Sequence, residues 1–179
     1  MLVEGPSDAA VLHVLARRLG LAAPDVTVLS MGGVTNVGRH LREYAGRPDT
    51  AVSGLCDRGE VRFVAGALRR LGHDVEGADD LAPWGFFVCD EDLEDELIRA
   101  LGTAAVVEVV EREGELGQLH TFQQQPFQRS RPLHDQLRRF AGTKSGRKVR
   151  LAAALAADLP LDAVPAPLLA VLTSAYARP

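Results

Sequence analysis

Three groups of acidic residues follow apolar stretches of the sequence, at points where strands are predicted to end. The groups are Glu4 with Asp8, Asp57 with Glu60, and Glu94 within the acidic run 90–96. In a parallel α/β sheet, ligands bind at the carboxyl ends of the strands, where such side chains converge. Converging carboxylates repel one another and are costly to bury unpaired, so they require a hard cation. The pattern therefore predicts a site for Mg²⁺ or Mn²⁺.

A simpler interpretation of these carboxylates stays open. Asp8 and Glu60 each follow closely on a predicted helix start, where acidic side chains are favoured by the helix dipole. The run 90–96 can equally be a solvated stretch of charge.

Four apolar segments alternate with predicted helices in the first half of the chain. The predicted strands are 2–3, 26–29, 51–55 and 84–89, and the predicted helices begin at Ser7, near Asn36 and at about Glu60. The strands lack strict polar alternation, which is typical of a sheet buried on both faces. We expect an α/β fold with a parallel sheet of about four strands, flanked by helices.

The pattern changes after Asp90. Helices are predicted over 93–101, 105–113, 133–141, 147–157 and 166–176, and the Gln- and Pro-rich stretch 114–132 is predicted to be a loop. We therefore expect an α/β domain over 1–102 and a helical C-terminal extension, 103–179, packed on it.

Composition excludes several classes of protein. The chain has 179 residues, of which 46% are hydrophobic and 25% charged, so disorder and fibrous repeats are not expected. No apolar stretch reaches the ~18 residues of a membrane span, and no signal peptide opens the sequence. Cys56 and Cys89 are too few for a disulfide framework. A cytoplasmic protein with two reduced thiols and no membrane contact is expected.

Basic side chains concentrate between residues 127 and 150. This segment contains eight Arg and Lys residues and a single acid, Asp135. The members that we expect to contact nucleic acid are Arg138, Arg139, Lys144, Arg147 and Arg150. An acidic half followed by a basic segment suits a metal-dependent enzyme that acts on a polyanion. The alternative is a solvated helix face with basic capping residues.

The segment Leu2–Asp8 resembles the first motif of the topoisomerase–primase (Toprim) domain, in the form seen in the overcoming-lysogenisation-defect (OLD) family of nucleases. Further features follow in that family's order: Gly32-Gly33 with Asn36, Asp57 at a strand end, Asp92-Leu93-Glu94 at a helix start, and Gly146-Arg147-Lys148 before an Ala-rich helix. The resemblance covers nearly the whole chain and is strongest for Toprim portions that stand alone.

The resemblance implies a Mg²⁺-dependent centre that cleaves phosphodiester bonds of nucleic acid, DNA more than RNA. Glu4 and Asp8 would face the metal, Asp57 would be a direct ligand, and Glu94 would complete a second metal position. Lys148 matches the family's functional lysine and would offset charge on the phosphorane, while Glu4 could serve as general acid or base. A separate ATPase subunit is an implied partner.

One position departs from the family pattern. The second Toprim motif normally reads Asp-x-Asp, and this chain has Asp57-Arg58-Gly59. Glu60 is expected to replace the missing carboxylate from one residue further on. The alternative is a catalytically degenerate Toprim module that binds nucleic acid or a partner ATPase.

Two other binding functions are weighed against this interpretation. The stretch Gly142–Lys148 has the wrong spacing for a phosphate-binding loop, so ATP hydrolysis by this chain alone is not expected. A plain α/β protein that binds a nucleotide or small molecule stays open as a third hypothesis.

Overall fold

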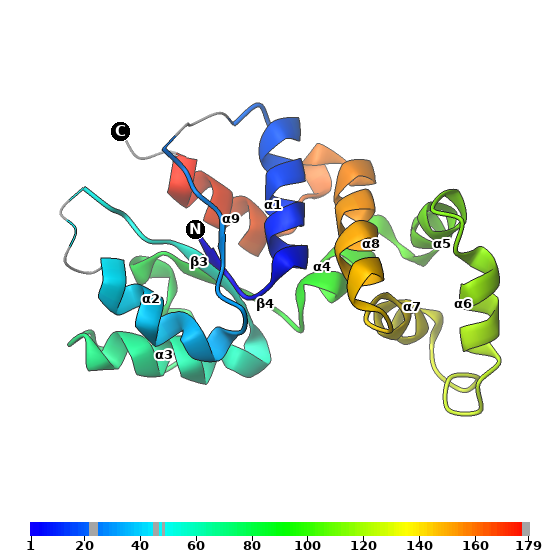
Figure 1. Ribbon diagram of the computed structural model, residues 1–179, viewed down its shortest axis with the longest axis horizontal. Helices are drawn as coiled ribbons and strands as arrows, with labels where there is room; N and C mark the ends of the chain where they lie inside the picture. The colour runs from blue at the N-terminus through cyan, green and yellow to red at the C-terminus, as the bar shows by residue number, and fades with distance from the viewer. Residues whose placement is uncertain (22–24, 45–46, 48, 177–179) are drawn as a thin grey trace.

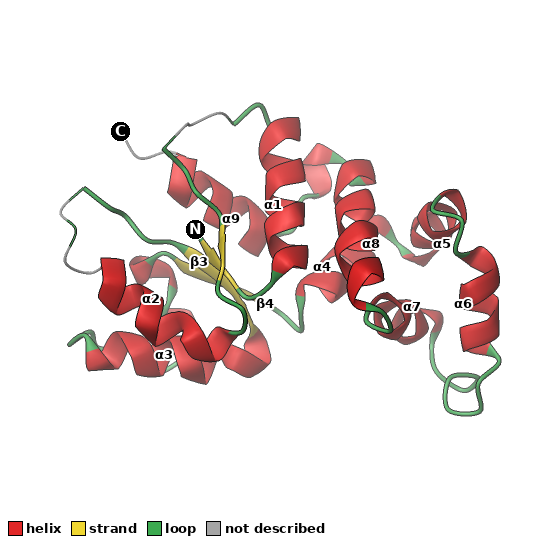
Figure 2. Ribbon diagram, in the orientation of Figure 1, coloured by secondary structure: helices red, strands yellow, loops and turns green. Residues whose placement is uncertain are grey.

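A four-stranded, all-parallel sheet lies at the centre of the α/β half (Figures 1 and 2). The computed structural model describes residues 1–21, 25–44, 47 and 49–176. The strands are β1 (Leu2–Val3), β2 (Leu29–Ser30), β3 (Gly54–Asp57) and β4 (Phe86–Cys89), and they lie in the order β2-β1-β3-β4. The predicted fold class, a parallel sheet of four strands flanked by helices, is confirmed.

Three of the strands begin later than predicted. β2 begins at Leu29 instead of residue 26, β3 at Gly54 instead of 51, and β4 at Phe86 instead of 84. β1 has only two residues, so β2 can pair with it over only two. Before β4, a 3₁₀ turn, η4 (Ala82–Trp84), and the left-handed Gly85 (φ +80°) bend the chain and leave no room for an earlier start.

One face of the sheet is covered by α2 (Val37–Tyr44) and α3 (Val61–Arg70). A short 3₁₀ turn, η1 (Val34–Asn36), precedes α2. Both helices place apolar side chains at helical spacing against the sheet, where Leu41, Val64 and Leu68 are buried with Phe86.

The other face is covered by helices from both ends of the chain. These are α1 (Pro6–Arg18) and α9 (Ala166–Tyr176), and α8 (Ser145–Asp158) packs against α1. The apolar stripe of α1, which includes Val11, Leu12 and Leu15, packs with residues of α8 and α9 in one continuous core. The C-terminal helix α9 contacts β3 and β4, so the end of the chain completes the α/β half (Figure 1).

Four further helices extend away from the sheet (Figure 1). They are α4 (Leu93–Leu101), α5 (Thr103–Arg112), α6 (Leu116–Gln123) and α7 (Leu133–Ala141). The prediction of a loop over 114–132 is wrong in part, because α6 occupies its first half and buries Leu119 and Phe122. Gln is a good helix former, so a Gln-rich segment does not break a helix.

The described helices are all too short or too polar to cross a membrane.

The hydrophobic core that lies under α1 also includes side chains of α4, α5 and α7. Side chains from both sides of residue 102 thus share one core, and the division into two domains at this residue stays a prediction.

Candidate metal centre

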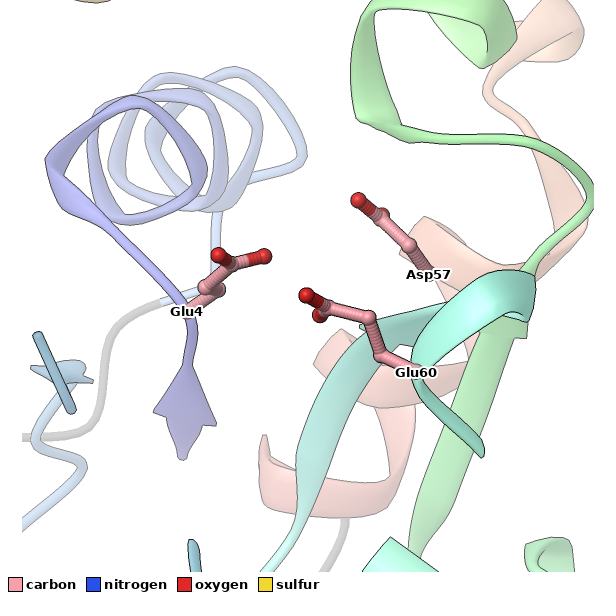
Figure 3. Close-up of side chains that lie close together, drawn as sticks. All are labelled: Glu4, Asp57 and Glu60. Atoms are coloured by element: carbon pink, nitrogen blue, oxygen red, sulfur yellow. The ribbon is translucent and has the colours of Figure 1, made fainter. Parts of the chain in front are cut away.

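Glu4, Asp57 and Glu60 bring their carboxylates together at the carboxyl end of the sheet (Figure 3). One oxygen of each side chain lies within 4.8 Å of the others. Figure 3 shows the three side chains pointing into a common space from different parts of the fold. This separation is one in which a single cation can contact all three groups after small side-chain movements.

Two neighbouring strands set these positions. Glu4 follows the end of β1, and its carbonyl accepts a hydrogen bond of 3.1 Å from the Gly33 amide. Asp57 is the last residue of β3, and the 3₁₀ turn η2 (Arg58–Glu60) brings Glu60 back beside it. The turn thus supplies a third carboxylate close to Asp57.

A pocket of about 370 Å³ surrounds part of this cluster. Its lining residues are Glu4, Gly5, Pro6, Ser7, Asp8, Gly32, Gly33, Asp57, Leu93, Glu94 and Lys148. Gly32 (φ +68°) and Gly33 (φ +112°) form a turn that only glycine adopts readily, and Asn36 Nδ2 donates to the carbonyls of Met31 and Gly32 at 2.9 and 3.2 Å. Five of the expected site residues therefore share one pocket.

Asp8 lines the pocket but also caps α1. Its Oδ2 accepts a 2.8 Å hydrogen bond from the Gly5 amide, and its Oδ1 accepts a 3.3 Å bond from the Ser7 hydroxyl. Burial raises the pKa of Asp8, while the Gly5 hydrogen bond and the nearby charge of Lys148 act in the opposite direction. Both the helix-capping interpretation and the site interpretation describe part of its surroundings.

Glu94 and Lys148 form an ion pair on the far wall of the pocket. Lys148 Nζ on α8 lies 3.3 Å from Glu94 Oε2 on α4. The Glu94 side chain is buried, and its Oε1 has no hydrogen-bond partner among the described residues. Burial raises the pKa of Glu94; burial would lower the pKa of Lys148, but the charge and hydrogen bond of Glu94 raise it.

The pKa values of two carboxyl groups in the cluster, Asp57 and Glu60, lie well above their ordinary range. Burial, followed by the charges of Asp8 and other nearby carboxylates, raises the pKa of Asp57 to about 8. Burial and a hydrogen bond to Glu4 raise the pKa of Glu60 to about 7. Such shifts arise where like charges converge without a compensating cation.

The residues fit a divalent cation. Glu60 Oε2 and Glu94 Oε1 are buried oxygens that lack a hydrogen-bond partner in the described part of the chain. Buried carboxylate oxygens are ordinarily hydrogen-bonded or metal-bound, and an all-oxygen donor set is the one preferred by Mg²⁺ and Mn²⁺.

An ion pair that the sequence did not indicate braces the η2 turn. Arg58 donates to Asp90 at the end of β4 through Nε and Nη2, at 3.0 and 2.8 Å from Oδ1. Arg99 on α4 contacts the other oxygen of Asp90 at 3.3 Å. No motif or spacing links these residues; only the adjacency of β3 and β4 brings them together.

Arg147 lies inside the protein and not on its surface. Its guanidinium contacts Glu115, Gln118 and Thr143, and it lies over the Phe140 ring at 4.0 Å from the centroid. This side chain therefore ties α8 to α6 and α7.

The other expected nucleic-acid contacts differ in how freely they face solvent. Arg138 pairs with Asp92 at 2.7 Å, and Arg150 pairs with Glu113 at 3.2 Å. The exposed members of the set are Arg139, Lys144 and Arg150. Acidic residues distant in sequence thus neutralise part of the basic segment.

A second pocket, of about 470 Å³, lies between α6 and the start of α8. Its lining includes Gln118, Phe140 and Lys144 but no carboxylate, so it lacks the donors that a cation needs. The pocket at the strand ends is therefore the candidate site.

Solved structures of OLD proteins share this fold. The C-terminal region of the Xanthomonas campestris pv. campestris OLD protein is 26% identical over 98% of this chain and 93% of that one, with a TM-score of 0.72. A second structure of that region has 25% identity, covers 98% and 90%, and has a TM-score of 0.74. The C-terminal region of the Burkholderia pseudomallei OLD protein has 22% identity, covers 97% and 93%, and has a TM-score of 0.67.

No family model and no curated protein matches the chain. The solved structures cover nearly all of it, in agreement with the extent of the resemblance in the sequence.

Proposed function

We propose that this chain, which is similar over nearly its whole length to the C-terminal regions of OLD proteins, is a Toprim-type domain that cleaves phosphodiester bonds of nucleic acid with the aid of a divalent cation. The cation, Mg²⁺ or Mn²⁺, would be held by Glu4, Asp57 and Glu60. The observation that carries the proposal is the approach of these three carboxylates to within 4.8 Å at the strand ends.

The cation would polarise the scissile phosphate and lower the pKa of a water molecule. Lys148, beside Glu94 in the same pocket, would contact the phosphate and offset the charge that develops there. Glu60 hydrogen-bonds with Glu4 and has a raised pKa, so its carboxyl group would hold or release a proton in this site.

Asp8 and Glu94 line the pocket and would support the metal site. Asp8 would orient the loop that carries Glu4, through its hydrogen bond to the Gly5 amide. Glu94 would offer its unpartnered buried oxygen to a second cation or to water. An arrangement with two cations would use both Asp8 and Glu94.

The proposed substrate is nucleic acid, with DNA favoured over RNA. Arg139, Lys144 and Arg150 are exposed near α7 and α8 and would contact phosphates, as would Arg138 on exchange of its carboxylate partners. Arg147 is assigned to the support of α8 instead, because its guanidinium is buried. A cytoplasmic location agrees with the two buried free thiols, Cys56 and Cys89.

Titration calorimetry with Mg²⁺ and Mn²⁺ tests the metal site directly. The parent protein is expected to bind, and Asp57→Asn, which keeps the shape of the side chain, is expected to lose at least tenfold in affinity. Asp158→Asn is a matched control, because Asp158 pairs with Arg112 on the surface and lies outside the pocket. Equal affinity of Asp57→Asn and the parent would refute the ligand assignment.

Cleavage of plasmid and of labelled oligonucleotides then tests the activity. We expect cleavage that requires the added cation and is lost in Glu4→Gln and Asp57→Asn. Metal binding without cleavage would favour the degenerate module, which binds nucleic acid or a separate ATPase subunit. The feature in favour of that second function is Gly59 at the place of the motif's second Asp.

A further inference from the structure

Phe127 is the most exposed large apolar side chain among the described residues. It is 83% exposed, whereas Leu161 and Trp84 are 43% and 38% exposed. It lies in the loop between α6 and α7, at the end of the molecule that is remote from the sheet (Figure 1). Full burial of a Phe side chain stabilises a protein by about 1.5–3 kcal/mol, so this ring contributes little to the fold.

The loop that carries Phe127 is held in one shape. Gln136 on α7 donates from Nε2 to the carbonyls of Gln128 and Arg131, at 2.9 and 3.0 Å. Gln123 at the end of α6 donates to Gln136 Oε1 at 2.8 Å. The Gln128 side chain beside Phe127 is buried. The aromatic ring is therefore presented from a fixed backbone, and binding of a partner would not have to order it first.

Two arginines follow Phe127 in the same loop. Arg129 donates through Nε to the Gln124 carbonyl at 2.7 Å, and Arg131 donates through Nε to the Phe127 carbonyl at 3.0 Å. Neither forms an ion pair within the described residues, in contrast to Arg138, Arg147 and Arg150. The terminal nitrogens of the two guanidinium groups are thus available to an external anion.

The surrounding sequence is free of acidic residues. From Leu116 to His134 there is no Asp or Glu. An exposed aromatic ring and two arginines in one acid-free loop match a nucleic-acid strand, which offers both flat bases and phosphates. A protein surface would need an acidic, apolar pocket to complement the same features.

We propose that the loop 124–132 is a contact site for single-stranded or locally unpaired nucleic acid, on which Phe127 stacks against a base. Arg129 and Arg131 bind the neighbouring phosphates. The proposal rests on the nucleic-acid substrate of the proposed function and adds a second contact, distant from the carboxylate pocket, that holds the strand. It also favours substrates that contain an unpaired stretch.

Fluorescence anisotropy in the presence of a chelator tests the contact without cleavage. A labelled single-stranded oligonucleotide and its duplex are titrated with the parent and with Phe127→Ala. Stacking of one base on an aromatic side chain gives an expected loss of roughly 5- to 100-fold in affinity for the single strand. The loss for the duplex is expected to be smaller.

Two further variants separate stacking from simple hydrophobic contact. Phe127→Tyr keeps the aromatic face and is expected to bind like the parent, whereas Phe127→Leu is expected to lose most of the same affinity. Leu161→Ala, at another exposed apolar position, is the control and is expected to bind like the parent. Unchanged melting temperatures of all four variants would show that the fold is intact.

Unchanged single-strand affinity in Phe127→Ala would overturn the proposal, as would equal binding by Phe127→Leu and Phe127→Tyr. Binding is measured without metal, and the metal site is measured by calorimetry without nucleic acid. The two proposals can therefore fail separately.

Discussion

At the scale of single residues, the missing second carboxylate of the Asp-x-Asp motif can be restored. A Cβ added at Gly59 would meet no atom within 4 Å, and Gly59 does not have a positive φ. We expect Gly59→Asp to fold and to bind Mg²⁺ several-fold more tightly, because it adds a carboxylate beside Asp57. Titration calorimetry measures the change.

Gly59→Ala serves as the control, since it changes the backbone entropy in the same way but adds no ligand. It is expected to bind Mg²⁺ like the parent. If Gly59→Asp also binds like the parent, Glu60 already fills the position and the added side chain points away from the cation.

Asp57 is expected to make the metal-free protein less stable as the pH rises. Its pKa is about 8 in the folded protein, so between about pH 4 and pH 8 the folded state holds a proton that the unfolded state has lost. Stability from this group is therefore present at low pH and is lost as the pH rises through 8. Asp57→Asn has no such proton and should lose less stability.

Thermal melts from about pH 5 to pH 9 in a chelator measure this difference. At the upper end, Asp57→Asn is expected to melt several degrees above the parent, since 1 kcal/mol shifts the melting temperature of such a domain by about 2–4 °C. Asp158→Asn should follow the parent. Parallel curves for parent and Asp57→Asn would contradict the proposed environment of Asp57.

At the scale of the elements, the Lys148–Glu94 pair joins α8 to α4 across the pocket. Lys148→Met would leave the buried Glu94 carboxylate without a cation. Because Lys148 is partly exposed, we expect a loss of about 1–2 kcal/mol in the free energy of unfolding, less than for a fully buried pair. Denaturant titration measures it.

Lys144→Met makes the same substitution four residues earlier, at the exposed residue that precedes α8 and hydrogen-bonds with Gln118. A change below about 0.5 kcal/mol is expected there. Equal losses in the two variants would mean that Lys148 acts only as a surface charge.

Most helices could be predicted from apolar spacing and the residues at their ends. The exception is α6, whose Gln-rich sequence resembles a loop in composition although Leu119 and Phe122 bury a clear apolar face. The strand starts were less predictable, because a two-residue β1 limits the length of pairing and no local signal shows that limit.

The acidic half of the candidate site could also be predicted, since strand ends in a parallel sheet meet at one edge. The positions and ion-pair partners of the basic residues could not be predicted. Arg147 is buried beside Glu115, and Arg138 pairs with Asp92; both partners lie more than 30 residues away. The density of charge along the sequence does not show which distant acidic residues these arginines contact.

At the scale of the whole molecule, a bound cation should stabilise the fold. Mg²⁺ at about 100 times its dissociation constant contributes about 2.7 kcal/mol, which corresponds to a rise of about 5–10 °C in melting temperature. Because Asp57 and Glu60 must release protons to bind it, the rise should be larger near pH 8 than near pH 6.

Thermal melts at both pH values with and without Mg²⁺ measure this effect. K⁺ at equal ionic strength is the control for general screening. A rise that is the same at both pH values would argue against binding at the carboxylate cluster.

The return of α9 to the sheet has a consequence for how the chain folds during synthesis. Its contacts with β3 and β4, and those of α8 with α1, come from the last 35 residues of the sequence. As the polypeptide leaves the ribosome, this face of the sheet is therefore covered by α1 alone until α9 has been made. Of the residues that line the carboxylate pocket, only Lys148 comes from this later segment, so the nascent chain holds the acidic residues of the site before the lysine that pairs with Glu94 has been made.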